Sequence, residues 1–397
     1  MQIGLVGKPS SGKSTFFNAA TMMNVPMAAY PFTTIEANKG IGFVRVECVD
    51  RDFKVQCNPK SGFCEKGIRY VPVEIIDVAG LVPGAHEGRG RGNQFLSDLS
   101  KADVLIHVVD ASGSTDEEGK EVNLGSHDPC KDIRFLEEEI DFWFLGILEK
   151  HWKKFYKTSF EGKKLLDLMA ESLSGIGGSP DNIKDAMSKA GLLEKKLEYW
   201  QQEDKINFCR SLRIISKPIM IAANKCDVGT AGENIKKMKK EFPYLAIIGC
   251  SAISELTLKK AAKEQKIKYL QGEKNFEVIS EIDDKQKAGL EYIRKNVLEK
   301  FGSTGVQEML DKVVFELLGY LAIFPGGTKS LQDQYGNYLP DCFLMPKNST
   351  VLDFAFRLHS DIGKNFIKAI NVKNKQLVGK EHLLKNRDVI EIVHSAK

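Results

Sequence analysis

The segment Gly7-Lys8-Pro9-Ser10-Ser11-Gly12-Lys13-Ser14 decides the fold of this chain. An apolar run precedes it at residues 3–6, and residues 15–20 favour a helix. The sequence therefore predicts a strand, a glycine-rich turn and a helix, with the GxxxxGKS spacing of a phosphate-binding loop. The glycines let successive backbone N–H groups point into one cup, and the helix start adds its positive dipole end. Lys13 would contact the β- and γ-phosphates of a nucleotide, and the Ser14 hydroxyl would bind Mg²⁺.

The size and composition are those of a multidomain globular protein. A chain of 397 residues with 42% hydrophobic and 28% charged residues predicts two or three domains. The net charge of +4 is too small to indicate a class of partner. We find no run of 18 apolar residues and no signal-peptide pattern after Met1. We therefore expect a cytoplasmic protein with no membrane partner, and nothing predicts DNA binding.

Three of the eight cysteines lie close together in the sequence, at Cys48, Cys57 and Cys64. A zinc site needs four ligands, usually at tighter spacing, and no fourth Cys or His is nearby. A Cys57–Cys64 disulfide would require an unusually oxidised or hyperthermophilic cytosol. Free thiols or small buried side chains are the favoured interpretation, and metal and disulfide remain the alternatives.

Alternating strand and helix patterns predict an α/β fold with a doubly wound, mostly parallel sheet. The nucleotide-binding domain is predicted at residues 1–112 and 217–320. An inserted helical subdomain is predicted at 113–216, with helices at 131–155, 162–173 and 192–215. A further helical insertion is predicted at 253–304, and the pattern changes to short strands and turns over 321–397. Motifs at the carboxyl ends of the strands would share one edge of the sheet.

Two short motifs extend the predicted phosphate site. Asp77 follows a predicted strand and can bind Mg²⁺, while the Gly80 N–H can contact a γ-phosphate. Thr34, in the preceding loop, can offer its hydroxyl to the same Mg²⁺ when a γ-phosphate is present. Because these groups surround the ion predicted at Ser14, we assign Ser14, Thr34 and Asp77 as metal ligands.

A second pair of motifs predicts guanine as the base. In Asn224-Lys225-x-Asp227 the carboxylate of Asp227 can accept the N1 and N2 hydrogen bonds of guanine. Adenine lacks this donor pair, so ATP would leave the carboxylate unpaired. The Lys225 stem can lie along the base, and Ser251-Ala252 can present a backbone N–H to guanine O6. These motifs together predict a GTP site.

The chain resembles the Obg-related GTPases of the translation-factor class. The resemblance rests on YPFTT at residues 30–34, on residues 77–85, on Gly88 and Gly90, and on residues 92–96. Within that class it is most similar to the YchF and developmentally regulated GTP-binding branches. The YchF branch lacks an intact Asn-Lys-x-Asp and prefers ATP, whereas this chain has the motif. The resemblance therefore implies a slow GTPase switch that uses Mg²⁺.

The C-terminal segment is similar to a TGS domain, a small ubiquitin-like (β-grasp) sheet. The matching stretches are residues 345–361 and 383–392, and the predicted domain spans 321–397. His359 is expected to end a helix of this domain. Because TGS domains occur in RNA- and ribosome-associated proteins, the resemblance implies a ribosome or RNA partner, contacted through the TGS domain and the helical regions.

Two departures from the family pattern bear on hydrolysis. Ser10 replaces an Asn that is linked to potassium binding in many members, so a potassium requirement is doubtful. Leu81 stands where Ras-like enzymes have the Gln that orients water. Hydrolysis should therefore be slow, and the residue that positions the attacking water is unknown. The candidates for that role in the same loop are His86, Glu87, Arg89 and Arg91, and the alternative is that they are ordinary solvated loop residues.

The predicted function has two alternatives. The nucleotide could act as an effector without meaningful turnover, or the chain could hydrolyse ATP in the YchF manner. The predicted catalytic residues are Lys13 and Thr34. The predicted nucleotide-binding residues are Gly7, Lys8, Pro9, Ser10, Ser11, Gly12, Lys13, Ser14, Thr15, Gly80, Asn224, Lys225, Asp227, Ser251 and Ala252.

Overall fold

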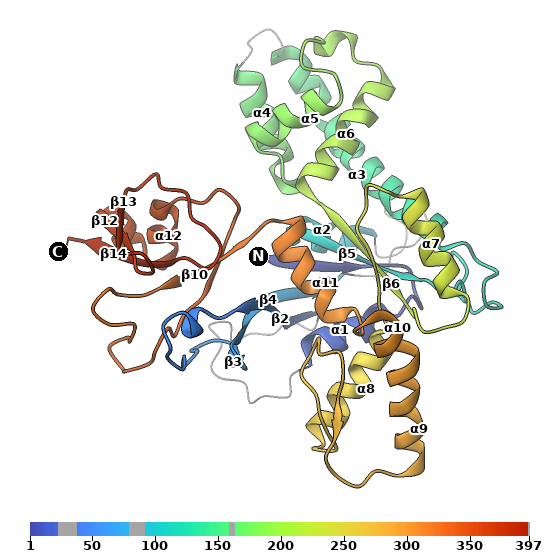
Figure 1. Cartoon of the computed structure of the whole chain (residues 1–397). Helices are drawn as coiled ribbons and strands as arrows, with labels where there is room; N and C mark the ends of the chain where they lie inside the picture. The colour runs from blue at the N-terminus through green and yellow to red at the C-terminus, as the bar shows by residue number, and fades with distance from the viewer. Residues whose placement is uncertain (23–37, 79–91, 159–162, 396–397) are drawn as a thin grey trace. The chain divides into compact units, whose positions relative to one another are not determined.

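The computed structural model of the chain is shown in Figure 1, and it describes residues 1–22, 38–78, 92–158 and 163–395. Thr34, Gly80, Leu81 and the loop candidates His86, Glu87, Arg89 and Arg91 lie outside these residues. In the described part of the chain, none of the helices combines the length and apolar character needed to cross a membrane.

The main sheet has the strand order β2-β4-β1-β5-β6-β7, with β3 paired to β4. The pairs β1–β4, β1–β5, β5–β6 and β6–β7 are parallel, and β3 runs antiparallel to β4. Because β1 lies between β4 and β5, the chain winds outward from β1 in both directions. The strands are β1 Gln2–Val6, β2 Lys39–Glu47, β3 Phe63–Glu65, β4 Ile68–Asp77, β5 Val104–Asp110, β6 Ile219–Asn224 and β7 Ile247–Gly249.

Helices cover this sheet and bury its central strands. Every residue of β5 and β6 is buried, as their continuous apolar sequences predict for internal parallel strands. Helix α1 packs against α8, and both contribute buried residues such as Phe16 and Leu258. The helices that belong to this part are α1 Lys13–Thr21, α2 Gly92–Lys101, α7 Ala231–Glu241 and α8 Ala252–Lys263.

The inserted helical region contains α3 Pro129–Thr158, α4 Lys163–Leu173, α5 Pro180–Lys189 and α6 Gln202–Ser216. Helices α3 and α6 run side by side (Figure 1). The sequence prediction of a helix over 192–215 was wrong at its start, because Gln201 and Asp204 form a capping box that begins α6 at Gln202. Helix α5 was not predicted. Its Ser179-Pro180 start, which resembles a helix break, is an N-cap followed by proline in the first turn.

Residues 253–304 are helical at both ends but not throughout. Strands β8 Ile267–Lys268 and β9 Glu277–Val278 pair between α8 and α9, and α9 spans Asp284–Ile293. A π-helical turn at Arg294–Leu298 continues into α10 Glu299–Phe301. After α11 Val306–Lys312, a second π-helical turn covers Val313–Leu317.

The C-terminal region is a five-stranded sheet with the order β11-β10-β14-β12-β13. Helices α12 Val351–Leu358 and α13 Ser360–Lys364 accompany it, and Phe354 is fully buried in the core between α12 and the sheet. His359 ends α12 as predicted, and its Nδ1 accepts a hydrogen bond of 3.1 Å from the Asp361 N–H. The strands are β10 Leu321–Pro325, β11 Phe343–Met345, β12 Phe366–Asn371, β13 Gln376–Val378 and β14 Val389–His394.

The described residues form two compact units. One contains residues 1–22, 38–40, 74–78, 92–158 and 163–309, and the other contains 41–73 and 310–395. The second unit therefore joins the excursion between β2 and β4 to the C-terminal sheet.

Candidate nucleotide-binding site

The loop at residues 7–14 links β1 to α1 and requires glycine at two positions. A Cβ atom at Gly7 would lie 2.5 Å from the Val108 carbonyl oxygen. Gly12 has a φ of 90°, in the left-handed region, and a Cβ there would collide with the amide of Asn224. A side chain at Gly7 would therefore have to displace the backbone of β5, and one at Gly12 would have to displace the Asn224 amide.

The groups that would contact the phosphates, at the end of the loop and the start of α1, are accessible to a ligand. Helix α1 begins without a side-chain cap, so the N–H groups of its first turn are available to an anion. Ser14 is exposed in that turn and Thr15 is half-buried. The Lys13 ammonium pairs with the carboxylate of Asp77, which stands opposite Leu5 at the end of β4. Lys13, Ser14 and Asp77 thus lie at one edge of the sheet, as the sequence predicts.

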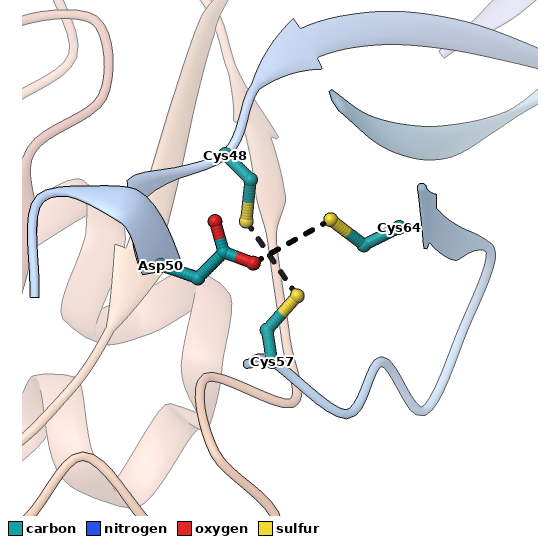
Figure 2. A group of neighbouring side chains, drawn as sticks. All are labelled: Cys48, Asp50, Cys57 and Cys64. Atoms are coloured by element: carbon teal, nitrogen blue, oxygen red, sulfur yellow. Dashed lines mark hydrogen bonds between the residues drawn. The ribbon is translucent and has the colours of Figure 1, made fainter. Parts of the chain in front are cut away.

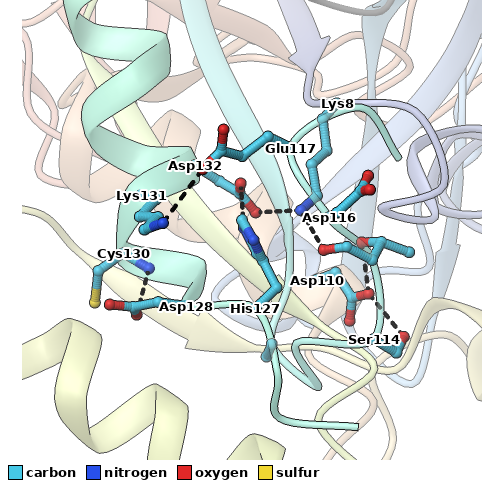
Figure 3. A network of polar contacts seen from close by, with 12 residues as sticks. Lys8, Asp110, Ser114, Asp116, Glu117, His127, Asp128, Cys130, Lys131 and Asp132 are labelled. Carbon is cyan, nitrogen blue, oxygen red and sulfur yellow. Dashed lines mark hydrogen bonds and ion pairs between the residues drawn. The ribbon is translucent and has the colours of Figure 1, made fainter. Parts of the chain in front are cut away.

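The side chain of Lys8 turns away from this edge. Its Nζ donates to the Thr115 carbonyl oxygen at 2.8 Å and pairs with Asp132 Oδ2 at 2.9 Å (Figure 3). His127 Nε2 lies 2.8 Å from the other oxygen of Asp132. Burial raises the pKa of Asp132, while Lys8 and His127 oppose that rise. Only the backbone of Lys8 is left for the predicted nucleotide contact.

The rest of the loop divides into exposed and buried positions. Pro9 and Ser10 are exposed, and Ser10 adopts a left-handed φ of 61°. Ser11 is fully buried, and its Oγ has no hydrogen-bond partner in the described part of the chain. Gly119 packs on the loop so closely that a Cβ there would lie 2.6 Å from the Pro9 carbonyl oxygen.

Asn224 joins the loop to the other nucleotide motifs. Its Nδ2 donates to the Ser11 carbonyl oxygen at 3.0 Å, and its Oδ1 accepts from the Ala252 N–H at 3.1 Å. Asn224 is 3% exposed and ends β6. A single amide therefore holds three loops together, and an aspartate could not donate the bond to Ser11.

The backbone N–H groups predicted to contact guanine O6 are already used within the protein. The Ser251 N–H donates to the Thr304 carbonyl oxygen at 2.9 Å, and the Ala252 N–H donates to Asn224. Guanine O6 could therefore accept from either group only if one of these hydrogen bonds were exchanged or shared.

Lys225 is held by a buried carboxylate that the sequence analysis did not single out. Lys225 Nζ lies 2.8 Å from Asp110 Oδ2. Asp110 also accepts hydrogen bonds from Ser112, Ser114 and Thr115, some of which are drawn in Figure 3. Burial alone would raise the pKa of Asp110, but the hydrogen bonds from Lys225 and the serines lower it. Its position at the end of the buried strand β5 was the signal that could have identified it.

A small hollow lies beside the loop. It has a volume of about 210 Å³, and it is lined by Ser10, Ser114, Thr115, Glu121, Val122 and Lys225.

Asp227 keeps an unused acceptor. Its Oδ1 is buried and has no hydrogen-bond partner among the described residues. Its Oδ2 accepts a hydrogen bond of 3.3 Å from the hydroxyl of Tyr292, which lies on α9. A buried acceptor without a partner costs free energy unless a ligand supplies the donor. Tyr292 is 65 residues away in the sequence, so no local pattern could have identified it.

A GxxxxGKS loop between the first strand and first helix of such a sheet defines the class of P-loop nucleotide-binding proteins. Three family models match the chain: 50S ribosome-binding GTPase over residues 2–133, Obg-like GTPase YGR210-like G4 motif-containing domain over 222–326, and TGS domain over 335–394. The chain belongs to the Obg-like GTPases of YchF type and is a GTP-binding protein of that family.

Three similar proteins cover 98% or more of the chain. An uncharacterized GTP-binding protein of Methanocaldococcus jannaschii is 45% identical over 100% of this chain and 99% of its own length. The crystal structure of a GTP-binding protein from Pyrococcus horikoshii OT3 is 39% identical, covers 100% of both chains and has a TM-score of 0.80. The ribosome-binding ATPase YchF of Bacillus subtilis is 28% identical over 98% of this chain and 97% of its own length. These matches confirm the predicted P-loop GTPase fold with a C-terminal TGS domain.

Proposed function

We propose that this protein hydrolyses GTP to GDP and phosphate with Mg²⁺, as a slow switch associated with ribosomes or RNA. The observation that carries the proposal is the unpaired, buried Oδ1 of Asp227 within an intact Asn-Lys-x-Asp. Guanine can donate N1–H and N2–H to this carboxylate, whereas adenine has no such pair of donors. A buried polar group left without its partner discriminates strongly between two ligands.

The phosphate groups would be held by the loop backbone, the first turn of α1 and Lys13. GTP binding would transfer the Lys13 ammonium from Asp77 to the β- and γ-phosphates and would free the Asp77 carboxylate. The exposed Ser14 hydroxyl and Asp77 fit a hard cation that prefers oxygen ligands. These two residues, with Thr34, would hold Mg²⁺, which neutralises charge on the phosphate oxygens.

Slow turnover follows from Leu81, whose apolar side chain cannot orient the attacking water. The water-positioning group would then come from the loop that holds His86, Glu87, Arg89 and Arg91, or from a partner. If turnover is negligible, the nucleotide acts as an effector only. Hydrolysis of ATP in the YchF manner is a further alternative, which the intact Asp227 disfavours.

The association with ribosomes or RNA is supported by the names of the relatives. One matching family model is described as a 50S ribosome-binding GTPase, and the YchF relative is described as a ribosome-binding ATPase. The TGS domain is consistent with such a partner. Retention of ribosomal subunits by the GTP form and not by the GDP form would support this part of the proposal.

A nucleotide competition assay tests the base assignment. GTP should displace a fluorescent GDP analogue at least 100-fold better than ATP, and Asp227→Ala should remove most of that preference. Equal displacement by GTP and ATP in the unaltered protein would rule out guanine specificity. Multiple-turnover phosphate release, with and without ribosomes, then tests hydrolysis. No release above background in either condition would leave the effector alternative.

A further inference from the structure

We propose that Cys48, Asp50, Cys57 and Cys64 bind a single zinc ion. Cys48 follows β2, and Asp50 lies in the short 3₁₀ turn Val49–Arg51. Cys57 lies in the loop that leads to β3, and Cys64 is in β3 itself. Figure 2 shows that the four side chains point toward one another from these separate segments.

The distances suit one tetrahedral ion. One ligand atom from each of the four residues lies within 4.8 Å of all the others. Cys48 Sγ and Cys57 Sγ are 3.6 Å apart, and Cys64 Sγ is 3.7 Å from Asp50 Oδ2. Zn–S bonds of about 2.3 Å in a tetrahedron place two sulfur atoms about 3.8 Å apart. The site is therefore closed by four protein ligands, as structural zinc sites are.

The donor set and its burial also favour a metal. Cys48, Asp50 and Cys57 are each at most 3% exposed. Asp50 Oδ1 is buried without a hydrogen-bond partner among the described residues. Thiolates with one carboxylate select a soft or borderline ion such as zinc over Mg²⁺ or Ca²⁺. Iron–sulfur clusters of the common types are held by four cysteine thiolates, whereas this group has three cysteines and one carboxylate.

A disulfide explains the group less well. All eight cysteines are free, and a disulfide requires sulfur atoms about 2.05 Å apart. A disulfide between any two of the three cysteines would leave the third thiol without a role and the Asp50 carboxylate buried beside the bond. A zinc ion uses all four groups at once.

A buried cation is already placed to balance the site. Three thiolates and one carboxylate exceed the charge of Zn²⁺ by two negative charges. Arg69 is 1% exposed, lies within electrostatic range of Cys48 and Cys57, and donates to the carbonyl oxygens of Leu339 and Pro340. Within the described ranges Arg69 forms no ion pair with a carboxylate, so its charge faces the cysteines.

The ion would have a structural role in the second compact unit. Residues beside Cys57 hold the C-terminal segment: the Asn58 N–H donates to the Tyr338 carbonyl oxygen, and the Lys60 N–H donates to that of Pro340, both at 2.9 Å. A zinc ion that ties residues 48–64 together would fix the surface on which residues 338–340 lie. The proposed site shares no residue with the predicted nucleotide site, so it does not depend on the proposed function.

The test is metal analysis of the full-length chain, purified without chelator and also reconstituted anaerobically with zinc. We expect about one zinc per chain, and a Co²⁺ derivative with thiolate-to-cobalt charge-transfer absorption and the intense bands of a tetrahedral ion. Cys57→Ser and Asp50→Ala should each weaken zinc binding at least 100-fold. Cys342→Ser is the matched control, because Cys342 lies within electrostatic range of the cluster but outside the ligand set.

Several results would overturn the proposal. They are a zinc content near zero in both preparations, a disulfide among the three cysteines in protein alkylated at lysis, or iron in place of zinc. Loss of zinc in Cys342→Ser but not in Asp50→Ala would overturn the ligand set. Since wild-type stoichiometry and the cobalt spectrum require no variant, a misfolded variant cannot decide the outcome.

Discussion

The P-loop cluster and the cysteine cluster are both buried polar groups, but their charges are balanced differently. Around the P-loop three buried or partly buried carboxylates have a lysine partner: Asp132 has Lys8, Asp77 has Lys13, and Asp110 has Lys225. In the cysteine cluster the four donors face one another, and Arg69 is the cation near them. The three lysine–carboxylate pairs balance their charges without a ligand, whereas the proposed zinc site needs a cation from outside the chain.

The difference follows from the cost of burying charge. A buried ion loses several kcal/mol of hydration, and a partner close by must restore it. A nucleotide can exchange places with Asp77 at Lys13, so the P-loop site keeps its shape between binding events. The cysteine cluster has no such internal substitute, and its shape should depend on the metal.

Removal of the metal should have the largest effect, and it tests whether the cysteine cluster depends on a bound ion. We expect zinc to raise the free energy of unfolding of the second unit by about 4 kcal/mol when free zinc exceeds its Kd 1,000-fold. Hydrogen exchange of the amides in β10–β14, recorded over a range of urea concentrations with zinc or with a chelator, measures this change in the free energy of unfolding. Unchanged protection in these strands after chelation would show that the cluster needs no ion. Nucleotide affinity serves as the control and should stay the same.

Replacing Lys13 tests how much the P-loop cluster contributes to nucleotide binding through this one charge. Lys13→Met removes the charge that would contact the phosphates, so the Kd for GTP should rise about 100-fold or more. Isothermal titration calorimetry measures the change. Lys101→Met, which removes an exposed lysine on α2, is the control and should leave the Kd unchanged. A change of less than threefold for Lys13→Met would show that the loop backbone alone holds the phosphates.

The smallest expected effect concerns His107, a buried group beside the P-loop cluster. Burial, and then the charge of Lys8, lower its pKa to about 3. The unfolded chain takes up the proton near its usual pKa of about 6.5, while the folded protein does not. The folded state is therefore destabilised as the pH falls from about 6.5 to about 3, by up to about 1.4 kcal/mol per pH unit.

His107→Leu should remove this pH dependence. Between pH 7 and pH 5 the wild-type free energy of unfolding should fall by about 2 kcal/mol more than that of the variant. Urea unfolding at both pH values provides the measurement, and His359→Gln, at an exposed helix cap, is the control. Parallel pH profiles for wild type and His107→Leu would contradict the assignment.

The sequence predicted the site best where one short segment performs one task. The loop at residues 7–14, Asp77 and Asn224 lie at strand ends, and β1, β4 and β6 bring them to one edge. Asp110 was missed although it also ends a strand, because a lone carboxylate has no motif. Tyr292 and Asp50 were missed because each acts through a contact with residues that no local spacing relates to it.

The fold shows the same division. The continuous apolar sequences of β5 and β6 are typical of buried parallel strands, and every residue of both strands is buried. Helix α5 and the β8–β9 pair were not predicted. A Ser-Pro start is common to helix caps and to turns, and strands of two residues have no detectable period. These short elements depend on the neighbours against which they pack.

The sequence by itself determined the P-loop fold, the guanine motif and the C-terminal TGS domain. Each of them is recognised from short continuous stretches, whose residues are neighbours in the sequence and remain close together in the folded chain. Only the tertiary structure decided where Lys8 and Lys225 point, which acceptor of Asp227 is unpaired, and that Asp50 completes a group with three cysteines. Those facts depend on segments that meet only after folding, where burial makes an unpaired charge costly and so determines which groups must find a partner.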